Sequence, residues 1–485
     1  MKLNISSKKF KETHKKKKNQ IAFYAQKCTN YNFVENLFRF ILVKENSFIF
    51  ESVEKGVVRG RYTIIGYDPD KIYNIKKNKI FVHNFKKTTV VKKNVLSFLN
   101  QLIENFKVSI PASLPRMSSM LVGYFSYDII RLIEKIPNNC KDDIDIPDIR
   151  LTRPKKLIIY DNVKKKIFFI QNIFRDQKIL NYQTEYQKIR NEFKELLNFG
   201  KIRLPSNFHK TRKQNRIKSN ITQSSFKSIV LKGKKYIKKG DIFQVVLSQR
   251  FESKIDKPPL EIYNTLRDIN PSPFMFYFNY KDFKILGSSP EILVRLVNNE
   301  VTIRPIAGTR PRGKNKNQDR KLTSELLKDP KELAEHLMLL DLGRNDAGKV
   351  SKIGSVNVTE KFKVEKYSHV MHIVSNVTGK LNKKFSPFET FLSGFPAGTV
   401  SGAPKIRAME IIDELEKSKR KLYAGGIGYF TAKQEFDTCI ALRTALIKNN
   451  KIYVQAGAGI VADSNPKKEY YETVNKAKAL LKAIN

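Results

Sequence analysis

Short apolar runs, each interrupted by lysine or by a turn-forming residue, are the feature that most constrains the fold of this 485-residue chain. None approaches the roughly 18 consecutive apolar residues that a membrane-spanning helix needs, so we expect no membrane span. The hydrophobic fraction of 41% still allows a sizeable core, which excludes wholesale disorder. The basic N-terminus lacks a continuous apolar stretch and does not resemble a secretory signal. We therefore expect a cytoplasmic protein.

The sequence pattern divides the chain into four parts. Residues 1–19 are rich in lysine and lack periodic apolar residues, which predicts a basic disordered tail. Residues 20–200 alternate β-like runs with turn signals and predict an N-terminal domain. Residues 201–222 are polar and broken by Pro205, which predicts a linker before a catalytic domain at 223–485. Strands are expected at 47–52, 62–66, 80–83, 121–127, 157–160, 243–247, 274–278, 301–306 and 453–456, and helices at 95–106, 185–199, 323–342, 405–416 and 467–484. The predicted fold class is α+β.

The formal net charge of +46 is compatible with binding to nucleic acid or to an anionic surface. A nucleic-acid site should gather basic residues in one patch, whereas the lysines here are spread over every predicted element. We interpret the charge as a general surface bias and keep a nucleic-acid binder as an alternative. The three cysteines lack the spacing of a disulfide scaffold or of a cysteine metal site.

Four glutamates at helical spacing form the first candidate site. Glu332 and Glu335 lie three residues apart, as do Glu469 and Glu472, so each pair shares one helix face. Two such helices facing each other would offer the oxygen ligands that Mg²⁺ prefers. The alternative is that these glutamates pair with lysines at the surface.

Two glycine-rich stretches resemble nucleotide-binding motifs without their context. Residues 308–314 match GxxxxGK, but Asn315 stands where a metal-binding hydroxyl is required. Residues 457–462 match GxGxxA, but Pro466 follows too soon for the helix of a dinucleotide fold to begin. The backbone N–H groups of these stretches could still bind a small carboxylate.

Two further residues are candidates for substrate or proton chemistry. Arg443 shares one face of a predicted strand with small residues, which leaves room for a ligand. It could bind a carboxylate through two hydrogen bonds, or it could form a structural ion pair. His372 is equally compatible with a hydrogen-bonded core residue and with a proton carrier.

A series of longer stretches is more specific than any single motif. In chain order these are PSPFMFYF, LGSSPEILVR, RPIAGTRPRG, ELAEHLMLLDLGRND, YSHVMHIVSNVTGKL, FPAGTVSGAPKIRAMEII, YAGGIGYF, DTCIALRTALI and VQAGAGIVADSNPKKEYYET. The series resembles the large subunit, component I, of the anthranilate synthases, within the chorismate-utilising enzyme family. The resemblance covers residues 223–484, and FIFESVEKGVVRGRYTIIG at 48–66 extends it into the N-terminal region.

The resemblance implies a large α/β architecture of two packed β-sheets flanked by helices, with chorismate bound in a cleft. It implies that ammonia adds at C2 of chorismate as the C4 hydroxyl leaves, and that loss of pyruvate then gives anthranilate. Mg²⁺ would neutralise the ring carboxylate. Glu335 and Glu472 match the family's metal-binding glutamates, with Glu332 and Glu469 flanking them.

The resemblance also assigns roles to single residues. Glu291 matches the general acid that assists departure of the C4 hydroxyl, so its pKa should be raised. His372 matches a histidine associated with pyruvate elimination, and Thr399 is expected to line the pocket. The positions that match chorismate contacts are Gly308, Thr309, Tyr423, Arg443, Gly457, Ala458 and Gly459.

Two positions distinguish this chain from sister enzymes. Ala307 stands where aminodeoxychorismate synthases carry the lysine of PIKGT. Gln244 stands where isochorismate and salicylate synthases place a lysine base that activates water. Because glutamine cannot deprotonate water, ammonia is the expected nucleophile. Aminodeoxychorismate synthase remains the alternative enzyme.

The family further implies a partner and a regulator. No cysteine of this chain matches an amidotransferase nucleophile, so ammonia is expected from a separate glutamine amidotransferase subunit, component II. The implied assembly is a heterotetramer of two large and two small subunits. A feedback site for L-tryptophan is expected at Glu51, Ser52, Arg61, Pro273, Phe274 and Met275. Phe274 replaces a commoner tyrosine, which removes one hydroxyl from that site.

Overall fold

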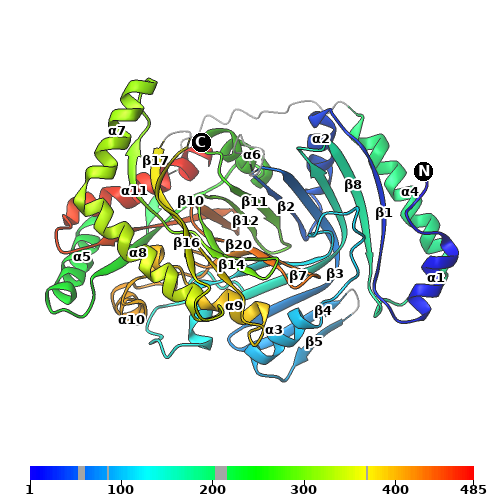
Figure 1. Ribbon diagram of the computed structural model, residues 1–485, viewed down its shortest axis with the longest axis horizontal. Helices are drawn as coiled ribbons and strands as arrows, with labels where there is room; N and C mark the ends of the chain where they lie inside the picture. Colours follow the sequence, from blue (N-terminus) through cyan, green and yellow to red (C-terminus); the bar gives the residue numbers. More distant parts are fainter. Residues whose placement is uncertain (53–59, 85–86, 203–215, 368–369, 485) are drawn as a thin grey trace.

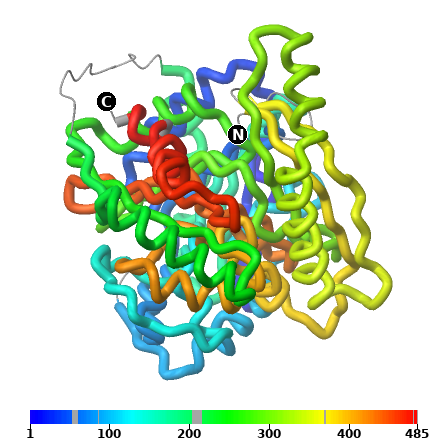
Figure 2. Tube along the Cα trace, turned by 90° about the vertical axis from the view of Figure 1, so that its left-hand side faces the viewer, coloured from blue at the N-terminus to red at the C-terminus, as the bar shows by residue number. Residues whose placement is uncertain are grey.

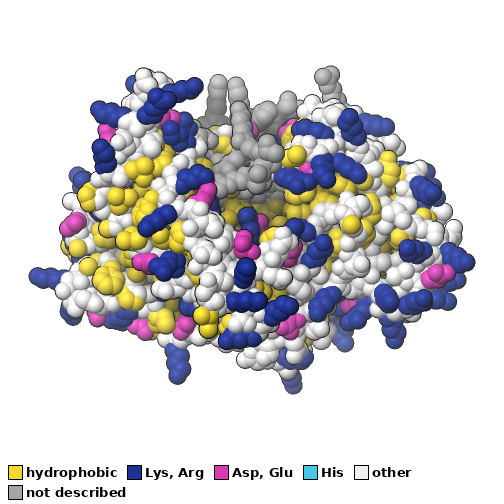
Figure 3. All heavy atoms as spheres, in the orientation of Figure 1, with side chains coloured by type: hydrophobic (Ala, Val, Ile, Leu, Met, Phe, Trp, Pro, Cys, Tyr) yellow, Lys and Arg dark blue, Asp and Glu magenta, His cyan; other side chains and the backbone are white. Residues whose placement is uncertain are grey.

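The computed structural model describes residues 1–52, 60–84, 87–202, 216–367 and 370–484. Its centre is a network of antiparallel strands, and helices cover the outside (Figure 1). Every helix in these residues is too short or too polar to cross a bilayer. Figure 3 shows Lys and Arg side chains scattered over the visible face, with Asp and Glu between them, rather than gathered in one patch.

The network forms two sheets. In the first, the spatial order is β9 (Lys218–Ser219), β10 (Gln244–Lys254), β22 (Lys451–Ile460), β21 (Thr444–Lys448), β12 (Lys284–Ser289), β11 (Phe274–Asn279), β2 (Ser47–Glu51), β3 (Tyr62–Lys76), β7 (Ile149–Asp161), β8 (Lys166–Ile173) and β1 (Gln20–Lys27). The short strand β18 (Gly402–Ala403) also pairs with β10.

The second sheet starts from the first half of β7 and continues through β6 (Met120–Phe125), β19 (Gly426–Thr431), β20 (Phe436–Ile440), β13 (Ile292–Val297), β14 (Glu300–Ile303) and β17 (Val370–Lys380). Both β15 (Ile306–Pro311) and β16 (Asn357–Lys366) pair with β17. A hairpin of β4 (Lys79–Asn84) and β5 (Lys87–Val91) extends from the end of β3.

The long strands β3 and β7 join the two sheets. The first half of β3 pairs with β2, and its second half pairs with β4. Between these halves the register shifts from Pro69 to Lys71, and Asp68 has a positive φ of 51°. Such an irregularity bends a strand, so β3 can leave one sheet and enter the other. The predicted architecture of two packed sheets is therefore confirmed.

Aromatic side chains fill the space between the sheets. Phe50 of β2 meets Tyr429 of β19 edge to face, with ring centroids 5.8 Å apart. Phe278 of β11 and Phe125 of β6 are fully buried in the same core. Each such side chain contributes about 1.5–3 kcal/mol on burial. This core fixes the distance between the sheets, and with it the shape of the space between them.

The helices cover the outer faces. Against the first sheet pack α1 (Ser7–Lys15), α2 (Tyr31–Ile41), α4 (Tyr182–Gly200), α6 (Pro259–Ile269) and α11 (Pro466–Ile484). At its edge, α5 (Gln223–Lys238) and α10 (Lys405–Leu415) pack on β10 and β22. Figure 2 shows α11 and α5 side by side. In the second half, α7 (Lys316–Lys328) and α8 (Pro330–Gly348) lie along β15 and β17, and α3 (Val95–Glu104) packs on α9 (Pro387–Ser393). Two short 3₁₀ helices are η1 (Tyr127–Leu132) and η2 (Gly398–Val400).

The predicted disordered tail at 1–19 is wrong for most of that segment. Residues 7–15 form α1, capped by Ser6, and Phe10 is fully buried against Tyr182 and Tyr186 of α4. The Gln20 side chain also donates to the Phe10 carbonyl at 2.8 Å. Phe10 and His14 are the buried residues of α1, and one apolar residue and one histidine among lysines give no periodic apolar signal.

The two predicted domains share both sheets. Strand β2, from the first region, pairs with β11, and β6 pairs with β19. The predicted linker at 201–222 lies mostly outside the described residues, and its described end contributes β9 to the sheet. The helix predicted at 323–342 is two helices, because Asp329 caps α8 and Pro330 occupies its first position.

Candidate active site

Glu291 lies in the link between β12 and β13 and is only 4% exposed. The Thr399 hydroxyl donates to Glu291 Oε1 at 3.0 Å, and the Ile306 N–H also bonds this carboxyl. Burial raises the pKa of Glu291 to about 8, against the opposing effects of these hydrogen bonds and of the Arg443 charge. The carboxyl is therefore protonated at neutral pH, as its expected role as an acid requires.

His372 lies on β17, where its buried ring faces the β15 strand. Its Nδ1 is 3.1 Å from the Gly308 carbonyl oxygen and 3.0 Å from Thr309 Oγ1. Because a carbonyl only accepts, Nδ1 carries the proton, and Nε2 is left with a free lone pair. Burial, and secondly the Arg443 charge, lower the pKa of His372 to about 4. The imidazole is thus neutral at physiological pH, with Nε2 able to accept a hydrogen bond or a proton.

Arg443 supplies positive charge beside both of these residues. Its predicted place on a strand face is wrong, because Arg443 lies in the link between β20 and β21. There it adopts a left-handed conformation, with φ of 46°, and its carbonyl accepts from the Ser288 N–H. Burial lowers the pKa of its guanidinium. Within the described residues Arg443 forms no ion pair, so its fork of donors is available to a carboxylate ligand.

Glycines on β22 leave space in front of two polar side chains. A Cβ at Gly457 would lie 2.6 Å from the Tyr423 hydroxyl oxygen, and a Cβ at Gly459 would lie 2.6 Å from Gln244 Nε2. Any side chain at either position would displace these groups. Ala458, between them, is buried on the opposite face against α5 and α10, so only its main chain can face the site.

The four predicted glutamates come from two helices. Glu332 and Glu335 lie on α8, and Glu469 and Glu472 lie near the start of α11. Gln244 Nε2 donates to Glu335 Oε1 at 2.9 Å, which joins the carboxylates to β10. Burial raises the pKa of Glu335, and the charges of Glu332 and Glu472 raise it further. The two helices therefore bring their carboxylates within electrostatic reach of one another.

This carboxylate group suits a hard divalent cation. Like-charged neighbours raise the pKa of Glu335, and a cation would remove that repulsion. No set of three or more acidic, histidine or cysteine side chains surrounds one point in the described parts of the chain. Glu335 and Glu472 are the side chains that could hold Mg²⁺, which typically retains waters and uses one or two carboxylates together with an anionic substrate.

Sequence reasoning missed two basic residues of the site. Lys476 Nζ lies 2.7 Å from Glu472 Oε1 and donates to the Gly457 carbonyl at 3.1 Å. Its spacing of four residues from Glu472 was the available signal. The fully buried Arg420 donates to the carbonyls of Val400 and Val246, at 2.7 and 2.6 Å. It thereby ties η2, which carries Thr399, to β10, and no sequence motif indicated this role.

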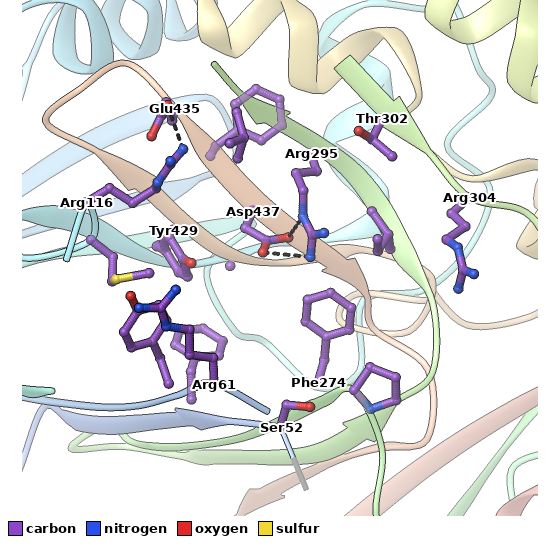
Figure 4. A pocket seen from close by; sticks show the side chains of 18 of the residues that line it. Ser52, Arg61, Arg116, Phe274, Arg295, Thr302, Arg304, Tyr429, Glu435 and Asp437 are labelled. Atoms are coloured by element: carbon purple, nitrogen blue, oxygen red, sulfur yellow. Dashed lines mark hydrogen bonds and ion pairs between the residues drawn. The ribbon is translucent and has the colours of Figure 1, made fainter. Parts of the chain in front are cut away.

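The residues predicted to bind tryptophan border a separate cavity of about 1130 Å³ between the sheets (Figure 4). Ser52, Arg61, Pro273 and Phe274 line it, and the Ser52 hydroxyl is buried with no partner in the described structure. Glu51 also borders the cavity, but Tyr263 donates to its carboxylate at 2.6 Å and Arg267 lies 3.0 Å away. Met275 is not part of the lining; it is fully buried on β11, opposite Glu51.

Comparison with known proteins agrees with this geometry. Residues 45–482 match the family model described as chorismate binding enzyme. The chain is 46% identical over 447 residues to anthranilate synthase component 1 of Cereibacter sphaeroides, covering 91% of this chain and 89% of that one. It is 45% identical over 443 residues to the component 1 of Acetivibrio thermocellus, covering 90% of each.

Solved structures give the same grouping. Anthranilate synthase component I from Streptococcus pneumoniae superposes with a TM-score of 0.78 at 37% identity, over 87% of this chain and 92% of that one. The menaquinone-specific isochorismate synthase of Escherichia coli shares the fold, with a TM-score of 0.72 at 17% identity over 99% of this chain and all of that one. The fold is that of a chorismate-binding enzyme. The chain belongs to that family, and within it to the group of anthranilate synthase component 1 proteins.

Proposed function

We propose that this chain catalyses the conversion of chorismate and ammonia to anthranilate, water and pyruvate, as the large subunit of an anthranilate synthase. The observation that carries the proposal is the buried Glu291, protonated at neutral pH and next to Arg443, which has no ion-pair partner among the described residues. An acid and a carboxylate-binding cation side by side suit a substrate that must lose a hydroxyl while its carboxylates are held.

In the first step, Glu291 donates its proton to the departing C4 hydroxyl, which leaves as water. The Thr399 hydroxyl and the Ile306 N–H then stabilise the carboxylate that remains. Gln244 positions the ammonia that attacks C2. Its Nε2 is held by Glu335, and its buried Oε1 has no partner in the described residues, so this oxygen can accept a hydrogen bond from ammonia.

In the second step, the ring loses the C2 proton, the bond between the ring and the enolpyruvyl oxygen breaks, and the ring becomes aromatic. The released enolpyruvate takes up a proton and becomes pyruvate. His372 Nε2 is the acceptor for that proton, since Nδ1 is committed to the Gly308 carbonyl. Arg443 and Tyr423 hold the enolpyruvyl carboxylate. Mg²⁺, when bound by Glu335 and Glu472, would neutralise the ring carboxylate. The flanking Glu332 and Glu469 would add negative charge to attract the ion.

The test is an assay of the purified chain with chorismate, an ammonium salt and Mg²⁺, read by anthranilate fluorescence. Glu291→Gln should lower kcat about 10²–10⁴-fold while the protein remains folded. Accumulation of an amino-chorismate by the unmodified chain would instead assign the first step alone. An amino-chorismate that carries its amino group at C4 rather than C2 would favour aminodeoxychorismate synthase, the alternative that Ala307 argues against.

A partner subunit is the second part of the proposal. The relatives are named component 1, and we propose that a glutamine amidotransferase, component 2, supplies ammonia within a heterotetramer of two large and two small subunits. Phe243 and Tyr471 are the two exposed aromatic side chains among the described residues, at 71% and 47% exposure. Each is the sequence neighbour of a site residue, Gln244 and Glu472. Phe243→Ser should therefore lower glutamine-dependent activity more than ammonia-dependent activity.

Feedback inhibition by L-tryptophan is the third part. A cavity of this size exceeds the roughly 300–1,000 Å³ of typical small-molecule sites and readily holds an indole. The unpartnered Ser52 hydroxyl offers a hydrogen bond to an amino acid ligand. Ser52→Phe should raise the tryptophan concentration for half-inhibition at least tenfold, measured with ammonia as the nitrogen source. Unchanged inhibition in that variant would place the tryptophan site elsewhere.

A further inference from the structure

The tryptophan cavity and the general acid share a wall. Pro290 and Ile292 both line the cavity, and Glu291 lies between them in the sequence. Glu291 is not among the residues that line the cavity; it lines the small pocket on the other side of this wall, which Ile292 also borders. The burial pattern agrees, since Glu291 is buried and its two neighbours are half-buried.

A third residue strengthens this connection. The Ile306 N–H is a hydrogen-bond donor to the Glu291 carboxyl, and Ile306 also lines the cavity. The position of the Glu291 carboxyl therefore depends on three residues of the cavity wall. Pro290 and Ile292 are its neighbours in the chain, and Ile306 donates a hydrogen bond to it. Thr399 contacts Glu291 from η2, and the small pocket that contains both residues is bordered by Asp346 and Arg304.

We propose that Pro290, Ile292 and Ile306 are positioning residues for Glu291, and that an occupant of the cavity controls proton donation by pressing on them. The proposal rests on the proposed function, because it gives a physical route for inhibition by tryptophan. A ligand that displaces this wall moves the Ile306 N–H relative to the carboxyl and moves Glu291 relative to the C4 hydroxyl of the substrate. Backbone shifts of this kind are transmitted because the strands on both sides are packed and do not deform continuously.

The direction of the effect follows from the hydrogen bond. The Ile306 N–H stabilises the ionised form of Glu291, so losing it favours the protonated form. Arg443 also favours the carboxylate. Asp346 is ion-paired with Lys349 and Lys405, and Arg304 with Glu360 and Glu365. The alkaline limb of kcat/KM should then move to higher pH by up to about one unit, while kcat/KM itself falls because the acid is displaced.

The test fills the cavity with a side chain instead of a ligand. Ile292→Phe adds an aromatic ring to the shared wall, and we expect kcat/KM for chorismate, with ammonia as the nitrogen source, to fall at least tenfold with the alkaline limb moved upward. Val297→Phe is the matched control, because Val297 lines the same cavity from the same strand β13. The alkaline limb of kcat/KM in the Val297→Phe variant should keep the wild-type pKa, even if the substitution changes the stability of the protein. Circular dichroism and thermal unfolding establish that both variants fold.

Equal shifts of the limb in both variants would overturn the proposal, because filling the cavity anywhere would then suffice. An unshifted limb in folded Ile292→Phe would overturn it as well. L-tryptophan gives an independent comparison: on the wild-type protein it should lower kcat/KM and move the limb in the same direction as Ile292→Phe. If calorimetry shows that tryptophan does not bind, tryptophan is not the regulator. The Ile292→Phe result still decides whether the cavity wall controls Glu291.

Discussion

Replacing Glu291 by glutamine removes a buried carboxyl whose raised pKa keeps it protonated at neutral pH beside Arg443. With a pKa of about 8, Glu291 is protonated in about ten of every eleven molecules at pH 7, whereas an ordinary glutamate is protonated in about one of 300. Glutamine keeps the volume and the hydrogen bond from Thr399 but has no proton to donate. Because general acid catalysis contributes about 10²–10⁴-fold, kcat should fall within that range.

The pH profile provides the second half of this prediction. The acid must be protonated to act, so kcat/KM should hold below pH 8 and fall about tenfold per unit above the pKa. Thr399→Val removes a donor that lowers the pKa, so its limb should move to higher pH. The assay is anthranilate fluorescence, with total ammonium adjusted to hold free ammonia constant at each pH.

A matched control separates this chemistry from general effects of a Glu→Gln change. Glu325 is exposed on α7 and touches no part of the site, so Glu325→Gln should keep wild-type kinetics. The reasoning would be refuted if Glu291→Gln kept more than about a third of wild-type kcat. It would also be refuted if the wild-type activity fell with an alkaline limb near pH 5, where an unshifted carboxyl titrates.

Three further predictions follow from the carboxylates, the free arginine and the N-terminal helix. Glu335→Gln should raise the Mg²⁺ concentration for half-maximal activity at least tenfold, measured by metal titration after chelation, and an unchanged value would remove Glu335 from the metal site. Arg443→Lys should raise KM for chorismate by about 10–100-fold, since lysine cannot make a two-point contact, and steady-state kinetics would expose the error if KM were unchanged. Phe10→Ala should lower the free energy of unfolding by about 3–5 kcal/mol in urea titrations, whereas a disordered tail would show no loss.

Much of the catalytic site could be predicted from the sequence because its residues lie in distinctive stretches. The spacing of Glu332 and Glu335 placed both on one helix face, and α8 presents them as expected. The raised pKa of Glu291 was expected from its assigned role, and the structure gives burial as its physical cause. Local patterns were sufficient at these positions because each feature depends on one strand or helix.

Features that depend on contacts between distant segments could not be predicted. The pairing of β2 with β11 joins segments more than 200 residues apart. The predicted domain boundary near residue 200 therefore divides a sheet that both regions share. The burial of Phe10 depends on α4, and the role of Arg420 depends on carbonyls of two separate segments. The same holds for the shared wall at Ile292, because the cavity that Ile292 lines is formed by segments far apart in the sequence.

The central claim is that this chain alone converts chorismate and ammonia to anthranilate with the help of a divalent cation. The most direct measurement is a turnover assay of the purified chain with chorismate, an ammonium salt and Mg²⁺, followed by fluorescence and by analysis of the products. The account predicts fluorescent anthranilate and equimolar pyruvate, both lost on addition of a chelator. Chorismate left unconsumed by a folded chain, or product formation that is indifferent to chelator, would contradict it.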